Sequence, residues 1–228
     1  TGDHGGVAHM GNVEVVDVED PQATFGVVPP VIDSVGGRFD LEGFPTNHSD
    51  VAALMVLEHQ AHMTNLITRI GWETRRVLHR SNMTTAADRG QGTDDGRFLE
   101  TIRDAAVELV DYMLFVDEAP LSTAVTPSSR FTEVFEARGP SDRHGRSLRA
   151  FDLTNRLFRY PCSYMIYTDA FNALPQLALD EVYARMWAVL NGKVTESPYD
   201  RLSLDDRQAI VEILLDTKSD LPDYFGTL

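Results

Sequence analysis

The chain has 228 residues, 43% of them apolar and 24% charged, so it can bury a core without a disulfide or a structural metal. Its formal net charge of −15 disfavours nucleic acid and membrane surfaces as partners and favours a basic partner or a larger complex. Its one cysteine excludes an internal disulfide and a CxxCH haem attachment, and no apolar run reaches the roughly eighteen residues of a membrane span.

The N-terminal part of the sequence, residues 1–48, is interrupted every few positions by glycine or proline. Its best strand candidate is the β-branched run Val13–Val18. We expect an extended arm here, with room for a short β-ladder, followed by an α-helical domain over 49–228. Because the chain begins at Thr1 without a methionine, we expect residue 1 to be a processing site or an edge within a longer protein.

The remaining sequence predicts a mainly α fold, an irregular bundle of about five to six helices. The first helix is predicted from Val51 to about His79, capped by Ser49 or Asp50. Further helical segments are expected at about 97–116, 131–137, 148–158, 161–174 and 176–191, and after Ser203. The segments on either side of Pro175 are predicted to pack against the first helix.

A cluster of possible ligands lies on the first predicted helix, at Glu58, His59 and His62. One face of this helix is predicted to be buried, and its residues are Met55, His59, His62, Leu66 and Ile70. Both histidines can therefore be hydrogen-bonded core residues, ligands of haem or of a metal together with Glu58, or acid–base groups. The order of the residues is not HExxH, so a zinc-protease site is not predicted.

Two other places in the sequence carry reactive side chains. His4 and His9 lie in a glycine-rich N-terminal segment, where they are either haem ligands or incidental residues of a loop. Cys162 lies in an aromatic-rich run and is predicted to be a buried structural thiol, since no motif supplies a histidine base for it. No catalytic residue is predicted from these patterns.

Three blocks of the sequence resemble a family of large, exported, cytochrome c-like bacterial proteins whose N-terminal part carries CxxCH motifs. The blocks are residues 1–12 (TGDHGGVAHMGN), 49–60 (SDVAALMVLEHQ) and 156–167 (RLFRYPCSYMIY). Together with Leu202–Ser203 and Asp216–Lys218 they are spread over nearly the whole chain, which therefore resembles the C-terminal region of that family.

The resemblance implies an extracytoplasmic location, periplasmic or at the cell surface, and a role in electron transfer. Haem c would be attached outside this chain, on a partner polypeptide or an upstream segment of the same protein. His4, His9 and His59 correspond to recurring histidines of the family, whereas His62 has no clear counterpart. We therefore expect a subunit of a haem-dependent oxidoreductase complex that supplies histidine ligands or a docking face. The alternatives are a metal-dependent oxidoreductase with a site at Glu58, His59 and His62, and a cofactor-free assembly subunit.

Overall fold

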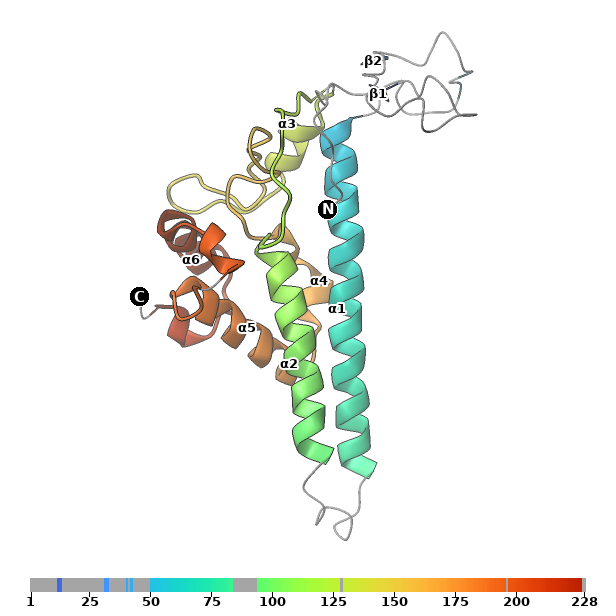
Figure 1. The fold of residues 1–228 in the computed structure, drawn as a ribbon, viewed down its shortest axis with the longest axis vertical. Helices are drawn as coiled ribbons and strands as arrows, with labels where there is room; N and C mark the ends of the chain where they lie inside the picture. The colour runs from blue at the N-terminus through green and yellow to red at the C-terminus, as the bar shows by residue number, and fades with distance from the viewer. Residues whose placement is uncertain are drawn as a thin grey trace. The chain divides into compact units, whose positions relative to one another are not determined.

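The structure, a computed structural model, is mainly helical, as the sequence predicts (Figure 1). It describes residues 12–13, 31–32, 40, 42, 50–83, 94–127, 129–195 and 197–226. The elements in chain order are β1 (Asn12–Val13), β2 (Val31–Ile32), α1 (Val51–Met83), α2 (Asp94–Met113), α3 (Phe131–Glu136), η2 (Tyr164–Tyr167), α4 (Asp169–Asn172), α5 (Gln176–Leu190), η3 (Tyr199–Arg201), α6 (Leu204–Thr217) and η4 (Asp223–Gly226), where η marks a 3-10 helix.

The described residues form two compact units. The first unit takes its described residues from Thr1–His59, Ala119–Arg138 and Phe151–Arg159, and the second from Gln60–Glu118, Gly139–Ala150 and Tyr160–Leu228. In the first unit β1 and β2 pair antiparallel, with Asn12 opposite Ile32, which is a short ladder of the kind expected in the arm. The rest of the arm, and with it the predicted boundary at residues 48 and 49, lies mostly outside the described residues.

Helix α1 begins where the sequence places its cap. The carboxylate of Asp50 accepts a hydrogen bond from the backbone N–H of Ala53 at 3.2 Å, which satisfies one of the free N–H groups of the first turn. The second oxygen of Asp50 accepts from the backbone N–H and the hydroxyl of Ser129, at 3.1 and 2.5 Å. The cap therefore also fixes the segment that leads into α3.

The helix predicted over residues 148–158 is wrong. Phe151 and Phe158 instead form an antiparallel β-bridge around a tight turn. The carboxylate of Asp152 accepts hydrogen bonds from the backbone N–H groups of Thr154 and Asn155, at 2.9 and 3.1 Å. Aspartate side chains that bind nearby backbone N–H groups stabilise turns at the expense of helices, so a turn forms here.

In the second unit, α2 lies between α1 and α5. Residues of α1 contact α2 through side chains: Arg69 donates to Glu108 at 2.5 Å, and the rings of His62 and Tyr112 lie 4.2 Å apart (Figure 1). Helix α5 packs along α2, which corrects the prediction that it packs against the first helix. One face of α2 is buried, at Ile102, Ala105, Leu109 and Met113.

The single helix predicted over residues 161–174 is instead two short helices, η2 and α4, because Thr168 separates them. Thr168 has an extended backbone, and its hydroxyl accepts a hydrogen bond from the N–H of Phe171, which starts α4. Ser163 caps η2 in the same manner, accepting from the N–H of Met165. Of the helices within the described ranges, none is both long and apolar enough to cross a membrane.

Candidate functional site

The predicted histidine cluster on α1 is only partly placed as expected. His59 is completely buried, whereas His62 and Glu58 are exposed. Successive helix residues are about 100° apart, and Met63, four residues after His59, occupies the core position instead of His62. The prediction that His62 lies on the buried face is therefore wrong.

His59 lies in the aromatic core of the first unit. Its ring meets that of Phe158 edge-on, with the centroids 6.0 Å apart. Phe158 in turn stacks on Phe151 at 5.3 Å and on Phe135 at 6.0 Å. A histidine in this position packs among phenylalanine rings and is closed to solvent.

The structure does not assemble Glu58, His59 and His62 into a three-ligand site. Among the described side chains, no three of His, Cys, Asp and Glu lie close enough together to hold a metal ion. His4 and His9 lie outside the described residues, so their predicted role as haem ligands remains a prediction.

Cys162 is completely buried, as the sequence predicts. Burial raises the pKa of its thiol far above the usual range, because the thiolate loses its hydration. A thiol that stays protonated is a poor nucleophile, so Cys162 is part of the core and not a reactive group.

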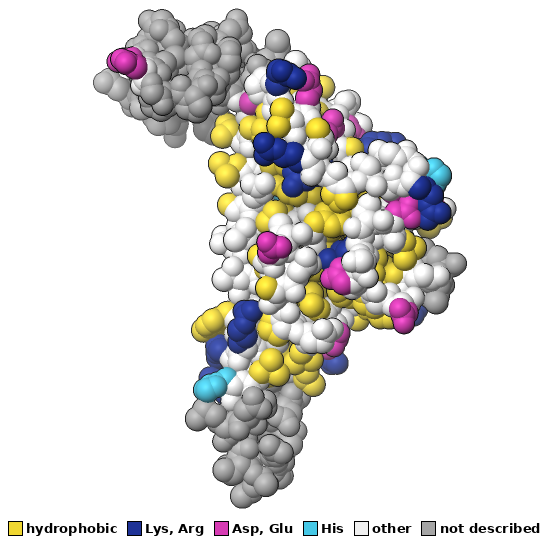
Figure 2. Space-filling model, turned by 180° about the vertical axis from the view of Figure 1, so that it is seen from behind, with side chains coloured by type: hydrophobic (Ala, Val, Ile, Leu, Met, Phe, Trp, Pro, Cys, Tyr) yellow, Lys and Arg dark blue, Asp and Glu magenta, His cyan; other side chains and the backbone are white. Residues whose placement is uncertain are grey.

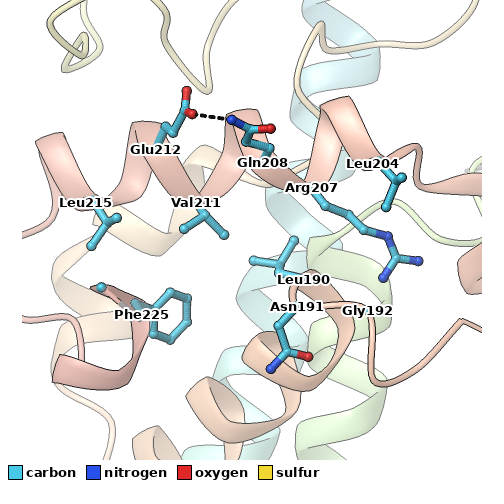
Figure 3. Close-up of a pocket in the computed structure, with 11 residues that line it drawn as sticks. Leu190, Asn191, Gly192, Leu204, Arg207, Gln208, Val211, Glu212, Leu215 and Phe225 are labelled. Carbon is cyan, nitrogen blue, oxygen red and sulfur yellow. Dashed lines mark hydrogen bonds between the residues drawn. The ribbon is translucent and has the colours of Figure 1, made fainter. Parts of the chain in front are cut away.

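A groove in the second unit is the best candidate for a functional site (Figure 3). It has a volume of about 630 Å³ and lies between the end of α5, one side of α6, and η4. Gly192, at φ +79°, allows the chain to turn away directly after α5, a conformation that other residues rarely adopt. The residues that line the groove are Leu190, Asn191, Gly192, Leu204, Arg207, Gln208, Val211, Glu212, Leu215, Phe225 and Gly226.

The floor of the groove is apolar, and two of its leucines face solvent. Leu190, Val211 and Phe225 are buried, and Figure 3 shows Leu215 above the Phe225 ring. Leu204 is 81% exposed and Leu215 is 45% exposed. None of the 11 lining residues is Ser, Thr, Cys, His or Lys. The groove is therefore suited to binding apolar side chains.

Arg207 fixes the base of the groove. Its side chain is almost completely buried, with 4% of the residue exposed, and its guanidinium donates hydrogen bonds to four backbone carbonyl groups. The acceptors are the carbonyl oxygens of Val189, Val194, Tyr199 and Leu202. Because Val189 belongs to the last turn of α5, the positive charge also stabilises the C-terminal end of that helix.

Ion pairs connect α6 to the loop that contains residues 142–146. Arg143 donates to both oxygens of Asp216, at 2.8 and 2.5 Å. Arg146 donates to Asp142 at 2.6 Å and to Glu212 at 2.7 Å. We call these five residues the α6 ion-pair cluster.

The cluster lowers the pKa of all three of its carboxylates. Hydrogen bonds from the side chain and then the backbone of Arg143 lower the pKa of Asp216, and those from Gln208 and Arg146 lower the pKa of Glu212. Burial acts to raise the pKa of Asp142, but hydrogen bonds from Arg146 and from the N–H of His144 outweigh it. A carboxylate with a lowered pKa in the folded state stabilises the fold at neutral pH.

We expect acid to destabilise the second unit through this cluster. The stabilisation is present above the ordinary carboxyl pKa of about 4 and is lost as the pH falls below it. Asp111 acts in the opposite sense, because burial raises its pKa. Thermal unfolding followed by circular dichroism from about pH 7 to about pH 3 should show a falling midpoint.

A pair of variants tests the origin of this pH dependence. Arg143→Gln should flatten the acid decline, because Asp216 loses the hydrogen bonds that lower its pKa. Arg69→Gln is the matched control, since it removes an exposed arginine from its ion pair with Glu108, outside the cluster. Equal acid slopes in the wild type and in Arg143→Gln would contradict the assignment.

Charges elsewhere on the surface are mixed. On the face drawn in Figure 2, Asp and Glu side chains lie among Lys and Arg side chains, with apolar side chains between them. The groove differs from this pattern because apolar side chains, those of Leu190, Leu204, Val211, Leu215 and Phe225, make up much of its lining. It is the feature that sets this part of the described surface apart.

The chain has no match among protein-family models, curated proteins or solved structures. The resemblance to cytochrome c-like exported proteins therefore stays a prediction from the three sequence blocks. The groove is defined by the geometry of the chain alone.

The sequence pattern emphasised the buried side of α6 and missed the groove side. Ile210, Ile213 and Leu214, which recur at helical spacing in the sequence, are buried. A second apolar stripe, Leu204, Val211 and Leu215, recurs at spacings of seven and four residues on another side of the helix. From this second stripe, an apolar surface on the groove side of α6 could have been predicted.

Proposed function

We propose that this chain is a helical assembly subunit of an extracytoplasmic, cytochrome c-like redox complex, with haem carried by a partner polypeptide or an upstream segment. The observation that carries the assembly role is the apolar groove with Leu204 exposed at its edge. Exposed leucines at the edge of an apolar groove are typical of protein interfaces. The redox context is supported by the resemblance of residues 1–12, 49–60 and 156–167 to the exported family.

Within this proposal the chain contributes a docking face and not a ligand from α1. His59 is completely buried against Phe158, so a haem on another chain has no access to its ring nitrogens. We therefore assign any axial ligation by this chain to His4 or His9. The net charge of −15 favours a partner with a basic surface.

The test uses the native complex that contains this chain. We expect visible absorption bands of c-type haem that sharpen on reduction with dithionite. His4→Ala or His9→Ala should change the haem spectrum or lower the haem content of the complex. His59→Phe is the control, because it keeps an aromatic ring in the core and should leave the spectrum unchanged.

Two results would overturn the proposal. A purified complex without haem bands would remove the redox context. A haem spectrum that changes with His59→Phe, in a protein that still folds, would place ligation at α1 and not in the arm.

A further inference from the structure

Leu204 projects from the first turn of α6 with little contact to its own chain, since it is 81% exposed. Leu215 is exposed at the opposite end of the same stripe, 11 residues later. At 1.5 Å per residue the two leucines are about 16 Å apart along the helix. Gln208 and Val211 lie between them on the same side, at helical spacing.

This stripe is complementary to itself when two copies run antiparallel. Leu204 then faces Leu215 of the other copy, so each end of the interface pairs two leucines. The exposed Gln208 side chains lie between these two pairs, above Val211, which is buried in its own chain. We propose that the groove binds helix α6 of a second copy of this chain in antiparallel register. The inference rests on the proposed assembly role and names the partner of its groove.

The groove has a recess at the position that Leu204 of a second copy would occupy. Leu215 and Phe225 form an apolar recess at the C-terminal end of the stripe (Figure 3). In the antiparallel pair, Leu204 of the second copy enters this recess, as one helix packs its ridges into the grooves of another. The two-fold symmetry repeats the contact at the other end.

Charges on α6 favour the same register. Asp205, Glu212 and Asp216 lie on one flank of the stripe, and Arg143, whose side chain is 72% exposed, is held on Asp216. In an antiparallel two-fold pair, the acidic flanks of the two α6 helices lie on the same side of the interface. The N-terminal end of each flank then lies beside the C-terminal end of the other. Arg143 of each copy then meets Asp205 of the other, which places opposite charges together twice. A parallel two-fold pair would place the two acidic flanks on opposite sides of the interface, so Arg143 of one copy would not meet Asp205 of the other.

The first test is the mass of the 228-residue chain in solution, measured by sedimentation from roughly 1 µM to 1 mM, the range in which moderate affinities are resolved. We expect a monomer–dimer equilibrium. Leu204→Glu should weaken the dimer by about tenfold or more, because it places a charge in the apolar recess. Leu57→Glu is the matched control, an exposed leucine on α1 that should leave the dimer unchanged.

Charge reversal tests the register. Asp205→Arg alone and Arg143→Asp alone should each weaken the dimer, and the double variant should recover it. Cysteine cross-linking gives an independent measurement, since the native Cys162 is buried. Chains with Leu204→Cys mixed with chains with Leu215→Cys should form a disulfide-linked dimer, whereas Leu204→Cys alone should not.

A chain that stays monomeric over this range, with no cross-linked dimer, would overturn the inference. If Leu204→Glu then removed the haem-bearing partner from the native complex, the groove would bind that partner, and the proposed function would stand without the dimer. If the dimer formed in a complex that lacked haem, the inference would stand and the redox role would fail.

Discussion

Arg207→Ala is expected to lower the free energy of unfolding by about 3–5 kcal/mol, since it leaves several buried carbonyl groups without donors. The guanidinium satisfies four of these groups at once, and no shorter side chain can do so. Burial lowers the pKa of Arg207, but arginine keeps its charge in proteins, so these hydrogen bonds remain charge-assisted. The loss should be measured by urea denaturation followed by circular dichroism.

Two comparisons make this prediction specific. Arg207→Lys should recover only part of the stability, because one ammonium group cannot reach four carbonyl oxygens spread over three segments. Arg201→Ala is the control, since Arg201 is exposed and donates to a single carbonyl, that of Val116, at 3.4 Å. A cost for Arg207→Ala no larger than that for Arg201→Ala would show that water replaces the guanidinium.

The sequence predicts those helices well whose boundaries depend on local chemistry. Asp50 and Ser203 cap α1 and α6 as expected, and Gly192 follows the end of α5. The failure at residues 148–158 is also local in origin, since Asp152 binds the backbone of its own turn. The turn that Asp152 makes allows Phe151 and Phe158 to form a bridge in place of the predicted helix.

The candidate site was much harder to predict. After buried His59, the next core position falls at Met63 and not at His62, one residue earlier. Apolar spacing in the sequence does not distinguish two such neighbouring positions. The groove depends on Phe225 and on the end of α5, which are distant in sequence from the stripe of α6. Whether Leu204 is covered is decided by those segments, so the sequence alone could show the stripe but not its exposure.

Phe158→Ala is expected to cost about 3–5 kcal/mol in the free energy of unfolding of the first unit, the usual range for a buried phenylalanine. Phe158 is almost completely buried and contacts three rings, those of His59, Phe135 and Phe151. Truncation would leave a cavity that the turn at Asp152 cannot close, because its hydrogen bonds hold Phe151 and Phe158 in register. Urea denaturation and hydrogen exchange should both report the change.

Hydrogen exchange also shows where the loss occurs. Because the first unit has its own aromatic core, Phe158→Ala should reduce protection in residues 51–59 and 151–159 before it affects α5 and α6. Phe131→Ala is the matched control, since Phe131 lies at the edge of the same cluster and is only half-buried, so it should cost less than about 2 kcal/mol. Equal costs for the two variants would show that Phe158 does not form the centre of this core. Uniform loss of protection through α6 would show that the two units unfold together.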